Sequence, residues 1–268
     1  MKMKKFTYIF LLASCLLLAS CESWLDEDPQ YTLNTQIQFS TSEKARAALY
    51  GCYGYFALTS GGYGQHWQEI PVRYSGFGWA QTNGGTNDMC GWLQCDYTDD
   101  LLTNAWYVMY KVINETNAFI ANVESTSLED KDEMAAEAHF LRALYYFNLV
   151  RLFGDVPLIK IQQTAAHDLQ VHRAPKEQIY ELIIQDLKDA ASLLPAQYEQ
   201  SSDIGRATKG ASLGLLAKVY LTLKRYDDTI STIEELETLN VYSLNKKYDW
   251  NFDYSRENGP ESLFEVQY

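Results

Sequence analysis

Apolar residues recur at helical spacing through most of the chain. The first such stretch, Ser42 to Leu58, predicts a helix that Thr41 or Ser42 can cap at its N-terminus. Further helices are expected over residues 99–122, 131–153, 208–223 and 226–239, and another from Pro175 to just before Pro195. The helix over residues 131–153 stops at Gly154, with Pro157 just beyond it, as helix ends commonly do. The pattern therefore predicts a mainly α-helical protein.

The last two predicted helices resemble the helical hairpin of a tetratricopeptide repeat. Small and aromatic residues fall near the positions that this 34-residue repeat prefers, namely Ala217, Tyr220, Tyr226, Thr229 and Ile233, although threonine replaces the usual alanine at 229. Ala143 and Tyr146 repeat the small and aromatic pair 74 residues earlier, which is about two repeat lengths. The alternative is an unrelated helical bundle in which alanine and tyrosine share this spacing by coincidence.

Residues 61–97 interrupt the helical pattern. They hold eight of the fifteen glycines and three of the six tryptophans, but only four charged residues. No period of 2 or 3.6 persists, so we expect a long irregular insert with little regular structure. Inserts of this length are usually functional or disordered, and the aromatic content argues against disorder. This segment is the first place to look for a binding site.

The N-terminus has the pattern of an export signal. Three lysines precede an apolar run from Phe6 to Ser20, which is too short to span a bilayer, for which about 20 residues are needed. The run ends in Leu18-Ala19-Ser20-Cys21, which resembles a bacterial lipobox, in which the cysteine is acylated and becomes the mature N-terminus. Two alternatives are an ordinary secretory signal and acylation at Cys15, which follows a near-identical copy of this pattern. We expect residues 1–20 to be a lipoprotein signal peptide and Cys21 to be the lipidation site.

The rest of the chain divides into a tether and a helical domain. Residues 21–40 are polar and have few periodic apolar positions, so we interpret them as a tether, and residues 41–268 as one domain. At the other end, Ser262 to Tyr268 alternates apolar and polar residues, which predicts a half-buried strand. A strand without a partner in the sequence suggests that the domain is truncated at its C-terminal end.

Composition narrows the possible functions. The chain has 268 residues, of which 47% are hydrophobic, which is too apolar for a disordered chain. Its 22 lysines and arginines against 35 acidic residues give a net charge of −13, which argues against nucleic acid as a partner. Five cysteines are too few and too scattered for a disulfide scaffold, although Cys90 and Cys95 could form one local bond or remain thiols.

Several segments, in order, resemble the SusD/RagB family of outer-membrane nutrient-binding lipoproteins. The segments are Cys21, WLDEDP at 24–29, the helix positions Trp106, Tyr110, Ile113 and Asn117, RALYYFNLVRLFGDVPL at 142–158, GRATKGA at 205–211, LAKVYL at 216–221 and ESLFEVQY at 261–268. The resemblance implies a tetratricopeptide-like scaffold at the cell surface. It also implies a SusC-like TonB-dependent transporter as partner and a glycan or other nutrient as ligand. Members of this family are typically about twice as long, so the chain corresponds to the N-terminal portion.

A glycan site needs an aromatic face for the apolar side of a sugar ring, together with amides or carboxylates that bond its hydroxyls. Residues 61–97 supply both types, and the family's ligand site lies partly in this position. The candidates are Trp67, Trp79, Asn83, Asn87, Asp88 and Trp92. The alternative is that some of these tryptophans fix the insert to the scaffold or contact the transporter.

Enzyme chemistry is not expected. The four histidines show no zinc-binding spacing with one another or with Cys90 and Cys95, and no phosphate-binding glycine loop follows a strand. Adjacent acidic pairs such as Asp99-Asp100 are more typical of solvated helix faces than of glycosidases. We therefore expect no catalytic residue, metal or cofactor. Two other functions remain, a helical scaffold or lid for the transporter, with a peptide nutrient or none, and an exported hydrolase.

Overall fold

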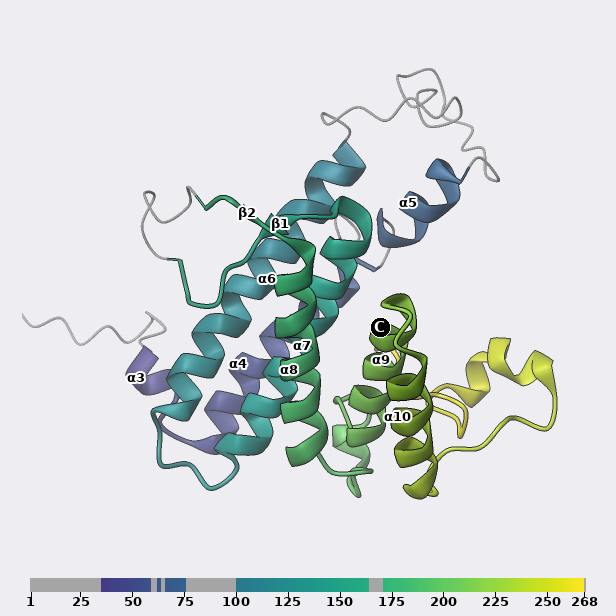
Figure 1. Cartoon of the computed structure of the whole chain (residues 1–268). Coiled ribbons are helices and arrows are strands. Elements are labelled where there is room, and N and C mark those ends of the chain that lie inside the picture. The colour runs from purple at the N-terminus through teal and green to yellow at the C-terminus, as the bar shows by residue number, and fades with distance from the viewer. Residues whose placement is uncertain (1–34, 59–61, 64–65, 76–99, 164–170, 268) are drawn as a thin grey trace, which may run out of the picture. The chain divides into compact units, whose positions relative to one another are not determined.

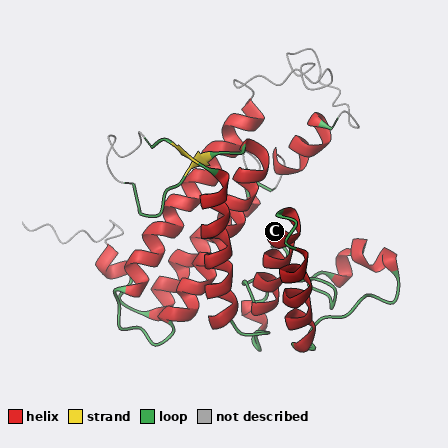
Figure 2. Cartoon of the chain, in the orientation of Figure 1, coloured by secondary structure: helices red, strands yellow, loops and turns green. Residues whose placement is uncertain are grey.

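The computed structural model describes residues 35–58, 62–63, 66–75, 100–163 and 171–267 (Figure 1). The α-helices are α3 (Thr35–Gln38), α4 (Ser42–Gly54), α5 (His66–Tyr74), α6 (Asp100–Glu124), α7 (Lys131–Phe153), α8 (Lys176–Leu193), α9 (Lys209–Thr222) and α10 (Tyr226–Thr238). Short 3-10 turns follow at Tyr55–Ala57, Ser201–Asp203, Tyr248–Phe252 and Tyr254–Arg256. Figure 2 shows how completely helices dominate, which confirms the mainly α prediction. None of the described helices is long and apolar enough to cross a membrane.

Consecutive long helices pack against one another in chain order. Helix α6 contacts α7, α7 contacts α8, α8 contacts α9, and α9 contacts α10, while α4 packs against both α6 and α7. This serial packing is the arrangement that stacked helical-hairpin repeats produce. The N-caps follow the sequence, because the hydroxyls of Thr41 and Thr208 accept hydrogen bonds from the backbone N–H groups of Lys44 and Ala211.

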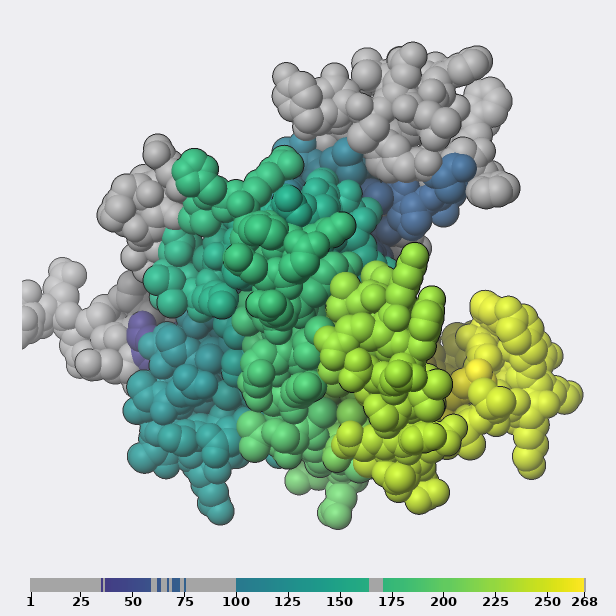
Figure 3. Space-filling view, in the orientation of Figure 1, coloured from purple at the N-terminus to yellow at the C-terminus, as the bar shows by residue number. Residues whose placement is uncertain are grey.

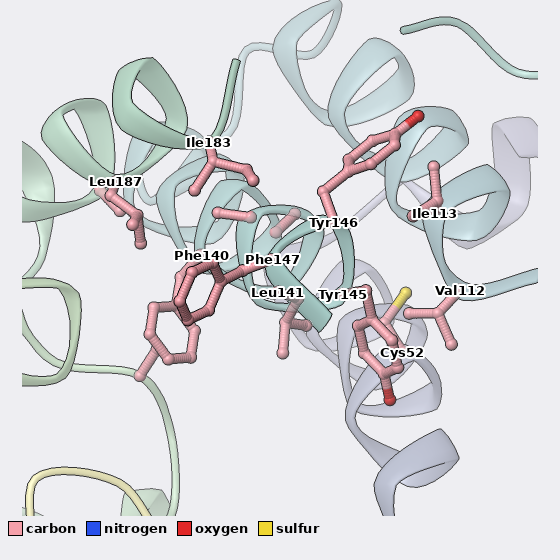
Figure 4. Packing of buried hydrophobic residues seen from close by; sticks show 14 of the residues in the cluster. Cys52, Val112, Ile113, Phe140, Leu141, Tyr145, Tyr146, Phe147, Ile183 and Leu187 are labelled. Carbon is pink, nitrogen blue, oxygen red and sulfur yellow. The ribbon is translucent and has the colours of Figure 1, made fainter. Parts of the chain in front are cut away.

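Helix α7 lies at the centre of the core. Its side chains are buried on more than one face, and Figure 4 shows them pointing in different directions. Tyr145 lies beside Cys52 of α4 and Val112 of α6, whereas Ile183 of α8 lies on another side of the helix. Burial raises the pKa of the Cys52 thiol to about 12, so this cysteine acts as a small apolar side chain, as the sequence predicts.

The chain reverses sharply after α7. Gly154 has φ of 69°, a backbone conformation that favours glycine, and its N–H still bonds to the Val150 carbonyl. The next residues form β1 (Val156–Pro157), which pairs antiparallel with β2 (Arg173–Ala174). This pair is the one sheet in the described part of the chain. Asp155 then accepts a hydrogen bond of 2.9 Å from the backbone of Lys176 at the start of α8.

Two predictions about local structure were wrong. Residues 61–97 contain helix α5, which the aperiodic pattern did not predict because the helix is only nine residues long and has Pro71 inside it. Residues 262–267 form no strand, because no described segment pairs with them. Instead, Phe264 and Val266 pack against the core without ladder hydrogen bonds.

The segment after α10 returns to α9, and Figures 1 and 3 show it, in yellow, beside these two helices. A Cβ atom on Gly210 would lie 2.2 Å from the Tyr242 ring, and one on Gly214 would lie 2.5 Å from Leu263. From the sequence alone, two glycines one turn apart in a helix would predict that a neighbouring helix approaches closely. The close neighbours are instead these two side chains, neither of which belongs to a helix.

Candidate functional site

Of the six predicted ligand residues, the structure describes Trp67. Trp79, Asn83, Asn87, Asp88 and Trp92 lie outside the described residues, as do Cys21, Cys90 and Cys95. Trp67 lies in the first turn of α5 and is half-buried against the core. The site can therefore be built from this residue and the side chains around it.

A tight turn places Trp67. The backbone N–H of Tyr63 donates to the Phe56 carbonyl at 2.9 Å, and that of Trp67 donates to the Gly62 carbonyl at 3.1 Å. Residue 62 must be glycine, because a Cβ atom there would lie 2.4 Å from the Leu58 carbonyl oxygen. The turn therefore holds α5 close to the end of the first long helix.

Trp67 lies in a cluster of aromatic and polar side chains from two parts of the chain. Its ring centroid is 5.4 Å from that of Tyr63, and the Arg151 guanidinium carbon is 5.9 Å from it. Tyr63 also packs edge-on against Phe56, at 5.3 Å. Because α5 and the C-terminal end of α7 are far apart in sequence, the fold creates this cluster.

Hydrogen bonds connect the polar members of the cluster. The amide nitrogen of Asn148 donates to the Tyr63 hydroxyl, and the Asn148 amide oxygen accepts from Nη2 of Arg151 at 2.7 Å. Burial raises the pKa of the Tyr63 hydroxyl to about 12, with Asn148 and Arg151 acting in the opposite direction. Partial desolvation also lowers the pKa of Arg151, whose side chain remains exposed. Tyr63 is thus a neutral hydrogen-bonding group at physiological pH.

This arrangement combines the elements that sugar recognition uses. Trp67 and Tyr63 supply apolar ring surface and Arg151 supplies a guanidinium, while the buried Asn148 holds Tyr63 and Arg151 in place. We define the four residues as the Trp67 cluster. Sequence reasoning missed three of them, since Asn148 and Arg151 lie within the stretch of α7 that indicates the family and were assigned no ligand role. The available signal was their spacing of three residues, which puts both on one helix face next to the apolar stripe.

A separate cavity of about 440 Å³ lies near the other end of the described chain. It is lined by residues 196–201, 203–206, 208, 241–242, 258–260 and 262–265. Arg206 lies over the Tyr198 ring there, at 4.1 Å, and is bonded to the carboxylates of Glu133 and Glu137 on α7. Trp67, the predicted ligand residue that the structure describes, does not line this cavity, so the cavity is the weaker candidate.

Comparisons with known proteins agree with the fold. A SusD-like protein of Bacteroides ovatus is 30% identical over 97% of this chain and 49% of its own length. Among solved structures, a SusD homologue from Bacteroides thetaiotaomicron aligns over 87% of this chain and 48% of its own, with a TM-score of 0.75 and 25% identity. A laminarin-binding SusD-like protein aligns over 84% and 50%, with a TM-score of 0.72 and 25% identity.

The chain thus spans about half the length of the relatives it matches. The family model described as "Starch-binding associating with outer membrane" matches residues 23–221, which include the Trp67 cluster, helices α4 to α8 and all but the last residue of α9. The match covers well over half of the chain, and the solved relatives share its helical scaffold. The chain therefore belongs to the SusD-like family.

Proposed function

We propose that this chain is the helical, sugar-contacting part of a non-enzymatic outer-membrane lipoprotein. It binds an oligo- or polysaccharide and delivers it to a SusC-like TonB-dependent transporter. The observation that supports this most directly is the family match together with a structural relative that is named as laminarin-binding. In this proposal Cys21 carries the lipid, and the Trp67 cluster, with Trp79, Asn83, Asn87, Asp88 and Trp92, contacts the sugar.

The physical argument for the site rests on the described part of the cluster. A half-buried tryptophan keeps part of its ring available to solvent while its neighbours fix its orientation, so little side-chain entropy remains to be lost on binding. The exposed Arg151 guanidinium beside it, which the buried Asn148 holds in place, can then orient the sugar hydroxyls.

Titration calorimetry of the full chain with laminarin, xyloglucan and starch oligosaccharides tests the proposal. Trp67→Ala should weaken binding of whichever glycan the wild-type chain takes. Trp250→Ala is a matched control, because Trp250 also lies beside an arginine, with the Arg256 guanidinium 4.0 Å from its ring. Absence of binding to any glycan across a broad panel would contradict the proposal, as would equal losses in both variants.

The lipid anchor needs its own test. Labelled palmitate should mark the wild-type protein and the Cys15→Ala variant, but not Cys21→Ala, in cells that process bacterial lipoproteins. Labelling that survives in Cys21→Ala would show that a residue other than Cys21 carries the lipid.

A second function is favoured by one observation, namely that Trp67 is tied to Tyr63 and Arg151 and so could serve to fix α5 to the scaffold. In that case the chain is a helical scaffold or lid for the transporter. The Trp67→Ala variant discriminates the two, because loss of transporter co-purification with retained glycan binding would support the scaffold.

A further inference from the structure

Arginine side chains lie over aromatic rings at several places in the structure, and one of them differs from the rest. In the described residues these are Arg151 over Phe147, Arg206 over Tyr198, Arg225 over Tyr220 and Arg256 over Trp250. Each of the last three also bonds to a carboxylate, from Glu137, Asp228 and Asp253 respectively. No carboxylate of the described residues lies within ion-pair distance of Arg151.

The Arg151 guanidinium is nevertheless held in one orientation. Its Cζ atom lies 4.2 Å from the Phe147 ring centroid, Nη2 donates to the Asn148 amide oxygen, and Nε donates to the Phe147 carbonyl at 3.3 Å. Asn148 is itself fixed by its bond to Tyr63. The Nη1 group has no acceptor among the described residues, and the side chain is exposed. A positioned guanidinium therefore presents free N–H donors to solvent.

A guanidinium in this state is suited to an oxyanion. It offers parallel N–H groups that match two oxygens of a carboxylate or a sulfate, and such charge-assisted bonds are about twice as strong as neutral ones. The chain's net charge of −13 would repel an anionic polymer at long range, so recognition would depend on this local arrangement rather than on steering. Trp67, whose ring lies 5.9 Å away, supplies the adjacent apolar surface that a sugar ring requires.

We propose that Arg151 is a subsite for the oxyanion of an acidic sugar, either a uronate carboxylate or a sulfate ester, with the sugar ring directed toward Trp67. The inference rests on the proposed glycan-binding function and specifies the class of ligand. It predicts selectivity for charged over neutral glycans.

Calorimetry of the full chain at low ionic strength would test this inference with three probes of equal length. The probes are an oligogalacturonate, its carboxyl-reduced neutral form, and a sulfated galactan oligosaccharide, so that the first and third arms distinguish carboxylate from sulfate. One charge-assisted contact implies a preference of about tenfold or more for the anionic probe over the neutral one. Arg151→Gln should abolish that preference by weakening the anionic probes more than the neutral one, whereas Arg151→Lys should retain part of it.

Arg225→Gln is the matched control, because Arg225 also lies over an aromatic ring, at 4.6 Å, but has Asp228 as its partner. This variant should keep the full preference. Binding of neutral glycans without any preference for acidic ones would overturn the inference and leave the proposed function intact. Failure to bind any glycan would overturn both. A preference that persists in Arg151→Gln would also overturn the inference.

Discussion

Helix α7 carries two arginines nine residues apart whose surroundings are opposite in kind. Arg142 is buried and bonds through Nε and Nη2 to both carboxylate oxygens of Asp186 on α8, at 2.8 and 2.7 Å, and through Nη1 to Asn117 on α6. Arg151 is exposed and bonds only to an amide and a carbonyl of its own helix among the described residues. The first arginine uses its donors to connect three helices, while the second keeps donors free.

The difference between the two arginines follows from their burial. A buried guanidinium must be fully paired, because an uncompensated charge in the interior is very costly. An exposed one is not under this constraint, so its orientation can be selected for a ligand. Position along α7 therefore separates a buried, ion-paired arginine from an exposed one that pairs with no carboxylate of the described residues.

Removal of Arg142 should have the largest effect. Arg142→Met keeps most of the side-chain volume but leaves the Asp186 carboxylate buried without its main partner. Loss of one partner of a buried ion pair costs about 3 to 5 kcal/mol of unfolding free energy. Urea denaturation followed by circular dichroism would measure it. A loss below about 1 kcal/mol would mean that water or His139 compensates the charge, and that the two arginines differ less than the geometry indicates.

The next largest loss of stability should come from a change in the turn that ends α7, three residues after Arg151. Gly154→Ala places a side chain at a φ of 69° and should cost about 1 to 3 kcal/mol. Gly51→Ala is the control, since a Cβ atom there would meet nothing within 4 Å, and this change inside α4 should stabilise the protein by about 0.5 to 1 kcal/mol. If both variants are equally stable, the strain argument for the end of α7 is wrong.

The sequence anticipated the scaffold well because the scaffold depends on local signals. The expected helix at 131–153 coincides with α7, since an apolar stripe runs up to Phe153 and glycine and proline follow it. Thr229, which departs from the repeat pattern, is tolerated because its hydroxyl bonds to the Arg225 carbonyl at 2.9 Å within the helix.

The candidate site was harder to predict because it depends on contacts between distant residues. Tyr63 and Asn148 are 85 residues apart, and nothing in either local pattern indicates that they bond to each other. Helix α5 likewise depends on a turn in which Gly62 approaches the Leu58 carbonyl, a requirement that becomes visible only in three dimensions. Trp67 could be chosen as a candidate from the aromatic composition of residues 61–97, but its neighbours in the folded chain could not.

Acid titration of Asp186 gives a smaller effect than deletion of its partner. Burial raises the pKa of this carboxyl, but hydrogen bonds from Arg142 and His139 outweigh it, so the folded pKa lies below the ordinary 3.8. The carboxyl therefore contributes stability that is fully present above about pH 3.8 and is lost as the pH falls through the folded pKa.

Denaturation of wild type and Asp186→Asn between about pH 5 and 2 would measure this contribution. The difference in unfolding free energy between the two proteins should narrow as the pH falls. A difference that is independent of pH would show that the carboxyl has the same pKa in the folded and unfolded chains.

Replacement of Arg151 should have the smallest effect on stability. Arg151→Gln removes a cation over the Phe147 and Trp67 rings, which is worth about 0.5 to 1 kcal/mol at an exposed site, and it breaks no ion pair among the described residues. Urea denaturation beside Arg142→Met would therefore compare the two arginines directly, with the expected losses differing several-fold. If the two losses were similar, Arg151 would be a structural residue like Arg142, because a free energy of that size requires a buried or paired charge. A small loss of stability together with a changed preference among glycans would instead separate the two roles on a single helix.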